Sequence, residues 1–67
     1  MKSTIVDGGE TVSVGDYVCF KHCIEQTGEI KAIRRNSLGQ IELTLESTDD
    51  CGGLTRTMMY AEDCWVE

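Results

Sequence analysis

The residues of this sequence best suited to chemistry are four cysteines and one histidine: Cys19, His22, Cys23, Cys51 and Cys64. Structural zinc is usually held by thiolate and imidazole ligands, in cysteine pairs with about two to four residues between them. Cys19 and Cys23 have that spacing, whereas a whole predicted strand separates Cys51 from Cys64. We therefore predict no metal and no other cofactor, with the thiols serving as small apolar groups or exposed side chains. A zinc site of Cys19, His22, Cys23 and Cys51 remains the open alternative.

Catalytic side chains would need partners that the sequence does not supply. His22 is the only histidine, and Cys23 beside it points to the other face because neighbouring residues of an extended chain alternate. The carboxylate pairs Asp49-Asp50 and Glu62-Asp63 fall in predicted turns, where solvation is their ordinary role. We predict that the protein is not an enzyme.

The elements that would position these residues are predominantly β-strands, and the clearest pair spans residues 14–21 and 27–33. In the first strand Val18 and Phe20 alternate with outward-pointing Tyr17, Cys19 and Lys21, which is typical of a half-buried strand. Ile30 and Ile33 in the second strand are three positions apart, so a β-bulge near Lys31-Ala32 is needed to bring both into the core.

The remaining chain is predicted to complete one small domain over residues 1–67. In order, we expect a polar lead-in at 1–11 with a short edge strand at Ile5-Val6, a loop at 22–26, a hairpin turn at 34–39, a strand at 40–46, a polar loop at 47–53, a strand at 54–60, a 3-10 turn at 60–63 and a closing strand at 64–66. The predicted core is Val14, Val18, Phe20, Ile30, Ile33, Ile41, Leu43, Leu45, Cys64 and Val66, with Val12 as a further candidate.

Two short motifs resemble those of SH3-like barrels. The run Val14-Gly15-Asp16-x-Val18-x-Phe20, followed by Gly28-x-Ile30-x-x-Ile33, resembles the opening of KOW, Tudor-like and related barrels. The segment from Tyr60 to Cys64 resembles the turn that leads into their last strand. The resemblance implies an all-β fold, a single five-stranded SH3-like barrel with a 3-10 turn before the last strand. Because many unrelated functions share this fold, it implies little about activity.

One enzyme family with this barrel is kept as an alternative. The Gly-Asp-x-Val opening of the type II dihydrofolate reductases is similar to Gly15-Asp16-Tyr17-Val18. Their pore-lining Val-Gln-Ile-Tyr segment corresponds to residues 57–60, which read Thr-Met-Met-Tyr, so only Tyr60 is carried over. The glutamine that contacts the ligands in that family is absent, and we rank this alternative last.

The chain is acidic, with six Lys and Arg against twelve Asp and Glu, for a net charge of −6. The excess lies after residue 35, where Arg56 is the only base, and this distribution argues against nucleic acid as the main ligand. The sequence holds neither a long apolar run nor the apolar core of a signal peptide, so we expect a cytoplasmic protein that does not bind membranes.

A surface for a protein partner is predicted from aromatic and acidic residues. SH3-like barrels that bind peptides use exposed aromatic side chains flanked by acidic loops. The predicted partner-binding residues here are Tyr17, Glu42, Glu46, Asp49, Asp50 and Trp65. We expect a small non-catalytic accessory or regulatory module of the kind that phages and mobile elements encode, inhibitory toward a partner with a basic, nucleic-acid-binding surface.

A KOW-like nucleic-acid-associated module is the first alternative to that function. It would use a basic strip formed by Lys21, Lys31, Arg34 and Arg35. Binding through such a strip would weaken steeply with salt, because it depends on contacts to phosphates.

Overall fold

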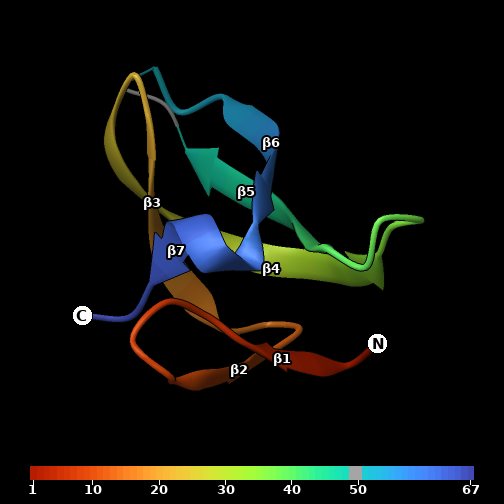
Figure 1. The fold of residues 1–67 in the computed structure, drawn as a ribbon. Helices are drawn as coiled ribbons and strands as arrows, with labels where there is room; N and C mark the ends of the chain where they lie inside the picture. The colour runs from red at the N-terminus through yellow and green to blue at the C-terminus, as the bar shows by residue number, and fades with distance from the viewer. Residues whose placement is uncertain (49–50) are drawn as a thin grey trace.

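The computed structural model describes residues 1–48 and 51–67, which form an all-β chain (Figure 1). Its elements are β1 (Ser3–Ile5), β2 (Thr11–Ser13), β3 (Tyr17–His22), β4 (Ile24–Arg35), β5 (Ile41–Thr48), β6 (Leu54–Tyr60), the 3-10 turn η1 (Ala61–Asp63) and β7 (Cys64–Trp65). The predicted 3-10 turn before a short last strand is thus confirmed. Within the described residues, no helix is long and apolar enough to cross a membrane.

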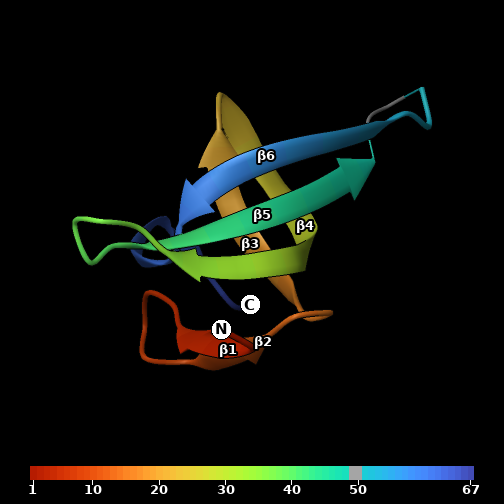
Figure 2. The same cartoon turned by 90° about the vertical axis from the view of Figure 1, so that its right-hand side faces the viewer.

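The strands form two antiparallel sheets (Figure 2). β1 pairs with β2, and the other five strands form one sheet in the order β6-β5-β4-β3-β7. Consecutive strands are neighbours from β3 to β6, and β7 returns to pair with β3 through Cys19 and Phe20. The all-β class and the five-stranded sheet are confirmed. The ladders between described residues leave β6 and β7 as the two edges, so a closed barrel is not shown.

The long strand β4 bends and carries the predicted bulge. Its first half pairs with β3 and its second half with β5, and the register toward β5 shifts between Ile30 and Ala32. The extra residue is Lys31, and it moves the following residues by one position along the ladder. Both Ile30 and Ile33 are consequently buried, as the sequence predicted.

The core lies between the inner face of this sheet and the β1–β2 hairpin. Its fully buried side chains are Val18, Phe20, Ile30, Leu43, Leu45 and Cys64. Two predicted core residues are wrong, because Val14 and Val66 are exposed, and Ile41 is only partly buried. Val14 lies at the corner between β2 and β3, and Val66 follows the point where β7 stops pairing with β3.

Cys19 was predicted to face solvent, yet it is buried. It lies opposite Trp65 on one side and opposite Thr27 on the other, and its Sγ is 3.8 Å from Thr27 Oγ1. Residues directly opposite one another in a ladder share a face, so both neighbours lie over the thiol. The outer face of β3 is therefore covered at this point.

The predicted loop at 22–26 is also wrong, because β3 continues to His22 and β4 begins at Ile24. Only Cys23 lies between the strands, with a φ of 67°. This left-handed conformation is uncommon for residues other than glycine. The side-chain amide of Gln26 donates to the carbonyl of His22 at 3.1 Å and supports the turn.

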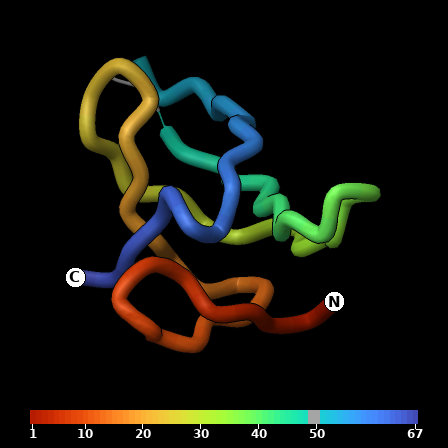
Figure 3. Tube along the Cα trace, in the orientation of Figure 1, coloured from red at the N-terminus to blue at the C-terminus, as the bar shows by residue number. Residues whose placement is uncertain are grey.

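The predicted polar lead-in is an ordered hairpin that docks on the C-terminal segment (Figure 3). Val6 and Val12 from this hairpin are buried in the core. The Asp7 N–H donates to the carbonyl of Cys64 at 2.9 Å, and the Val14 N–H donates to Lys2 at 3.0 Å. The Asp7 bond fixes the hairpin beside β7, whereas the Val14 bond lies within the hairpin, and a groove described below lies between the hairpin and η1.

Candidate functional site

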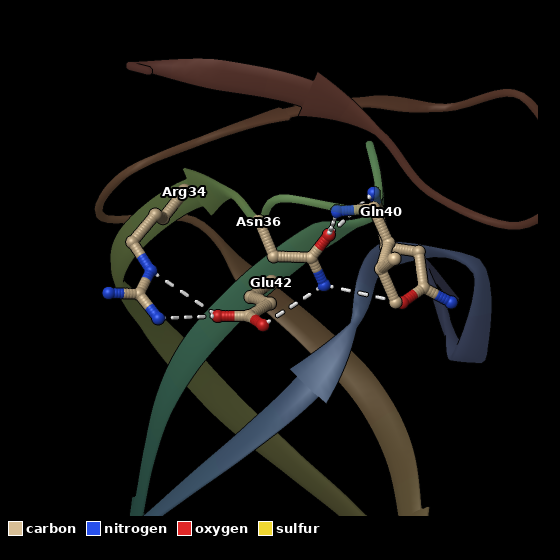
Figure 4. Close-up of polar contacts among 5 residues, drawn as sticks. Arg34, Asn36, Gln40 and Glu42 are labelled. Carbon is tan, nitrogen blue, oxygen red and sulfur yellow. Dashed lines mark hydrogen bonds and ion pairs between the residues drawn. The ribbon is translucent and has the colours of Figure 1, made fainter.

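Glu42 is a predicted partner-binding residue, but its carboxylate contacts side chains of the same protein, Arg34 and Asn36 (Figure 4). Its carboxylate lies 2.9 Å from Nη2 of Arg34 and accepts a 3.2 Å hydrogen bond from Nδ2 of Asn36. Its side chain is only 14% exposed. The hydrogen bonds from Arg34 and then Asn36 hold the pKa of Glu42 below its ordinary value.

Asn36 also builds the turn that brings it to Glu42. Its Oδ1 accepts hydrogen bonds from the N–H groups of Leu38 and Gln40, at 2.9 and 3.0 Å. The positive φ of Gly39, 83°, completes the turn. A hairpin turn is confirmed here, but it begins after the predicted residue 34, because Arg34 and Arg35 belong to β4. The turn fixes the side-chain amide of Asn36 beside Gln40 and Glu42 (Figure 4).

The negative charge of Glu46, the second acidic residue of the predicted partner-binding surface, is likewise compensated by neighbouring cations. Its carboxylate lies 3.2 Å from Nε of Arg56 and 3.7 Å from Nζ of Lys31, and its side chain is 17% exposed. Lys31 also contacts Glu29 at 3.2 Å. The hydrogen bond and charge of Glu29, with the charge of Glu46, raise the pKa of Lys31.

Strand register explains both sets of contacts. Arg34 lies directly opposite Glu42, and Arg56 lies directly opposite Glu46. The expected field of uncompensated negative charge is therefore absent at Glu42 and Glu46. The other two acidic residues of the predicted surface, Asp49 and Asp50, lie outside the described residues.

Tyr17 and Glu46 both line a groove of about 500 Å³ on the outer face of the sheet. Glu29, Thr48 and Leu54 also line this groove. Tyr17 is exposed, as predicted. Trp65 lies elsewhere, half-buried on β7 opposite Cys19, so the structure does not combine the predicted residues into one site.

A second groove, of about 420 Å³, lies between the β1–β2 hairpin, the 36–39 turn and η1. Its apolar lining includes Ile5, Leu38 and Ile41. Leu38 is 82% exposed and Ile5 is 61% exposed, both large apolar side chains beside a concave surface. Concave sites of this kind, apolar with a few polar groups, are the usual form of ligand pockets.

Two carboxylates line this second groove, and two others belong to the segments that form it. Asp7 and Glu62 line it, and Asp63 follows Glu62 in η1. Glu10 lies across the hairpin turn, where its carbonyl accepts the N–H of Val6 at 3.0 Å. Within the part of the chain that the structure describes, these four carboxylates form no ion pair, and the groove has no Lys or Arg in its lining.

The second groove was not predicted from the sequence. Glu62 and Asp63 were expected to be solvated turn residues, and the packing of their turn against the β1–β2 hairpin could not be deduced from either segment alone. One signal was present: Ile5 and Leu38 are large aliphatic residues in otherwise polar segments.

The thiols and the histidine are not gathered at one point. Cys64 is buried, and its Sγ donates to the carbonyl of Tyr60 at 3.5 Å. Burial and then the charge of Asp63 raise its pKa to about 11. Cys23 is exposed at the β3–β4 tip, and Cys51 is exposed in the segment before β6. Over residues 1–48 and 51–67, no three His, Cys, Asp or Glu side chains are placed to hold a metal ion.

Comparison with known protein families, with curated proteins and with solved structures finds no match for this chain. The geometry of the two grooves is therefore the basis for a functional proposal.

Proposed function

We propose that this protein is a non-catalytic protein-binding module whose partner presents a cationic segment with an apolar side chain. The segment would bind in the groove between the β1–β2 hairpin, the 36–39 turn and η1. The observation that carries this proposal is the juxtaposition of exposed Ile5 and Leu38 with the carboxylates of Asp7 and Glu62. The proposal keeps the predicted basic partner and moves its binding surface away from Glu42 and Glu46.

The two halves of the groove would contribute differently to binding. Ile5 and Leu38 would bury apolar area against the ligand, which stabilises a complex in proportion to the area removed from water. Asp7, Glu62 and Asp63 would attract a cationic segment and speed its association at low salt. Because these carboxylates form no ion pair with any residue that the structure describes, a cationic ligand would not have to displace such a partner.

We also propose that the fold is of the SH3-like barrel type. Support comes from the sheet order β6-β5-β4-β3-β7, the long bent strand β4 and the 3-10 turn before β7. Peptide binding at an exposed groove is compatible with such a fold, although the fold alone does not establish it.

A regulatory role follows as part of the same proposal. A cytoplasmic acidic module, encoded by a phage or another mobile element, would occupy the basic surface of a nucleic-acid-binding protein and exclude nucleic acid by charge mimicry. Its net charge of −6 supports this reading. The test is competition: a partner captured from host lysate should release nucleic acid when the module is added, and persistence of the nucleic-acid complex would contradict the inhibitory role.

The alternative of a basic nucleic-acid-binding strip loses part of its support. Lys31 contacts Glu29 and Glu46, and Arg34 contacts Glu42. These two cations are already compensated, so phosphates would have to compete with carboxylates for them. No observation favours the reductase alternative, for which Tyr60 remains the only shared residue of the pore-lining segment.

Chemical-shift mapping with short peptides tests the binding site. The probe is a peptide with one leucine between pairs of lysines, and the matched probes replace leucine by glycine or the lysines by glutamates. We expect the first peptide alone to shift the amide signals of Ile5, Leu38 and Glu62. Shifts spread over the whole surface, or equal binding of the glycine peptide, would contradict a groove with an apolar subsite.

Variants separate the groove from general charge effects. Asp7→Asn with Glu62→Gln should weaken binding of the leucine peptide about five- to tenfold, because both changes remove charge at the groove. Glu25→Gln with Glu29→Gln removes the same net charge from β4 and serves as the control. Equal loss in the two double variants would mean that net charge alone attracts the peptide.

A further inference from the structure

Strand β6 is an open edge of the five-stranded sheet. It pairs with β5 along its whole length, from Leu54 to Tyr60 (Figure 2). Among the described residues, no strand pairs with its other side. An edge of this kind presents unpaired backbone N–H and C=O groups, which can serve as a template for another strand.

The two edges of the sheet are protected very differently. β7 has only two residues, and the Asp7 N–H donates to the carbonyl of Cys64, so the β1–β2 hairpin covers that edge. β6 has seven residues, no proline and no shift of register against β5. Its only charged residue, Arg56, is held by Glu46. The usual devices that prevent edge pairing are therefore present at β7 and nearly absent at β6.

The side chains of β6 add to this exposure. Leu43 and Leu45 are buried and lie opposite Met59 and Thr57, which places those two residues on the inner face. The alternate residues Leu54, Arg56, Met58 and Tyr60 therefore lie on the outer face. There, Leu54 is 69% exposed and Met58 is 50% exposed.

We propose that β6 pairs with β6 of a second copy of this chain, antiparallel and centred on Thr57, to extend the sheet across a two-fold dimer. In this register Leu54 lies opposite the partner's Tyr60, and Arg56 lies opposite the partner's Met58. Thr55 lies opposite the partner's Met59 on the inner face. All seven residues of the strand are paired, and outer residues meet outer residues.

Neighbouring registers are less favourable. A slip must move by two positions, because a slip of one would place outer residues opposite inner ones. Centring the pair on Arg56 would place two guanidinium groups directly opposite each other. Centring it on Met58 would leave Leu54 and Thr55 without partners. The sequence of β6 is thus self-complementary in one register, which favours a second copy over an unrelated strand as the occupant.

Sedimentation equilibrium over a range of protein concentrations tests the dimer. We expect a reversible monomer–dimer equilibrium and, at concentrations where the dimer dominates, slower hydrogen exchange of amides within 55–59. A monomer at every concentration up to about millimolar, a range where even weak specific contacts are populated, would overturn the proposal.

Opposite charges at Met58 test the register. Met58→Lys would face the partner's Arg56 and should raise the dimer dissociation constant at least about tenfold, whereas Met58→Glu should lower it. Because Met58 is half exposed on the outer face, both variants should remain folded, as circular dichroism would verify. Ile24→Lys changes an exposed apolar residue on β4 and is the matched control.

Other outcomes would overturn the proposal. Equal effects of Met58→Lys and Met58→Glu would exclude the register centred on Thr57, and weakening by Ile24→Lys alone would place the dimer contact elsewhere. A monomeric chain that instead protects its β6 amides on adding a strand-forming peptide would assign the edge to a different partner. Tyr60 also lines the groove beside η1, but the substitutions at Met58 and Ile24 do not change the lining of that groove, so their outcomes do not depend on the proposed function.

Discussion

Two sets of carboxylates on this small protein have opposite surroundings. On the sheet, Glu42 and Glu46 are mostly enclosed and lie in contact with Arg34 and Arg56. At the hairpin end, the carboxylates of Asp7 and its neighbours in η1 form no ion pair among the described residues. The acidic character that a partner would meet is therefore greatest at turns, and the acidic residues of the strands serve mainly the fold.

Backbone pairing accounts for the difference. An antiparallel ladder places residues of neighbouring strands side by side at a fixed register, so an acid in one strand can meet a base in the next. Asp7 and Glu62 lie in turns, where no such register operates. The comparison teaches that charge counted along a sequence is a poor guide to charge presented at a surface.

The largest expected effect is a difference in folding stability between a substitution in the packed sheet and one in the groove. Leu43 is fully buried directly after Glu42, and Leu43→Ala should lower the free energy of unfolding by about 2–5 kcal/mol through lost packing and a residual cavity. Ile5→Ala, at the exposed groove, should cost about 0.5 kcal/mol or less. Urea denaturation measures both. Similar losses would show that the hairpin end contributes to stability as much as the sheet does.

A smaller loss of folding stability is expected from a substitution at Gly28, where β4 lies close to Phe20 and to the backbone of Glu46. A Cβ added at Gly28 would lie 3.0 Å from Cε1 of Phe20 and 3.2 Å from the backbone oxygen of Glu46. Gly28→Ala should therefore cost about 1–3 kcal/mol through overpacking. Thermal denaturation checks it, with Thr27→Ala as the neighbouring control. An unchanged melting temperature would mean that β4 and β5 can separate without loss.

The buried thiol of Cys64, beside the β1–β2 hairpin, should make the folding stability depend on pH in the alkaline range. Burial and Asp63 raise its pKa from 9.0 to about 11, so the folded chain keeps the proton more tightly than the unfolded chain. The contribution is complete below about pH 9 and is lost as the pH rises toward 11. Melting temperatures between pH 8 and 11 should fall in this window. Asp63→Asn should lower the pKa of the thiol, and an unchanged thiol titration would exclude an effect of that carboxylate.

The smallest effect should come from the paired carboxylates under acid. Hydrogen bonds from Arg34 and Asn36 lower the pKa of Glu42 below 4.5, so its contribution is present above that pH and is lost as the pH falls through the lowered value. Glu42→Gln should flatten the decline of melting temperature in acid slightly. Arg34→Gln should remove the larger part of this increment, because Asn36 still donates to Glu42, and adding Arg34→Gln to Glu42→Gln should cost nothing further. Additive losses would show that the two groups do not act as a pair.

The strands were predictable because their signal is local. Alternation identified Val18 and Phe20 as inward residues, and the spacing of Ile30 and Ile33 predicted the bulge. The burial of Cys19 was not predictable in this way, because it depends on Trp65 from the far end of the chain.

The candidate site was less predictable than the strands. Tyr17 and Glu46 line the same groove, but the pairing of Glu46 with Arg56 depends on the β5–β6 register, which alternation alone does not fix. The groove beside η1 depends on how the β1–β2 hairpin docks, and that docking uses backbone hydrogen bonds such as Asp7 to Cys64. Backbone contacts of this kind leave no mark on side-chain patterns.

The bulge at Lys31 also sets a rule of spacing for any related chain. A homologue without the extra residue would keep its inward aliphatic residues two positions apart, while one with the bulge would show the three-position spacing of Ile30 and Ile33. Removing Lys31 alone would take out the bulge and leave Ile30 and Ile33 two positions apart, so regular alternation would keep both residues on the inner face. Natural variation at this site should therefore gain or lose this one residue without any change of pattern downstream.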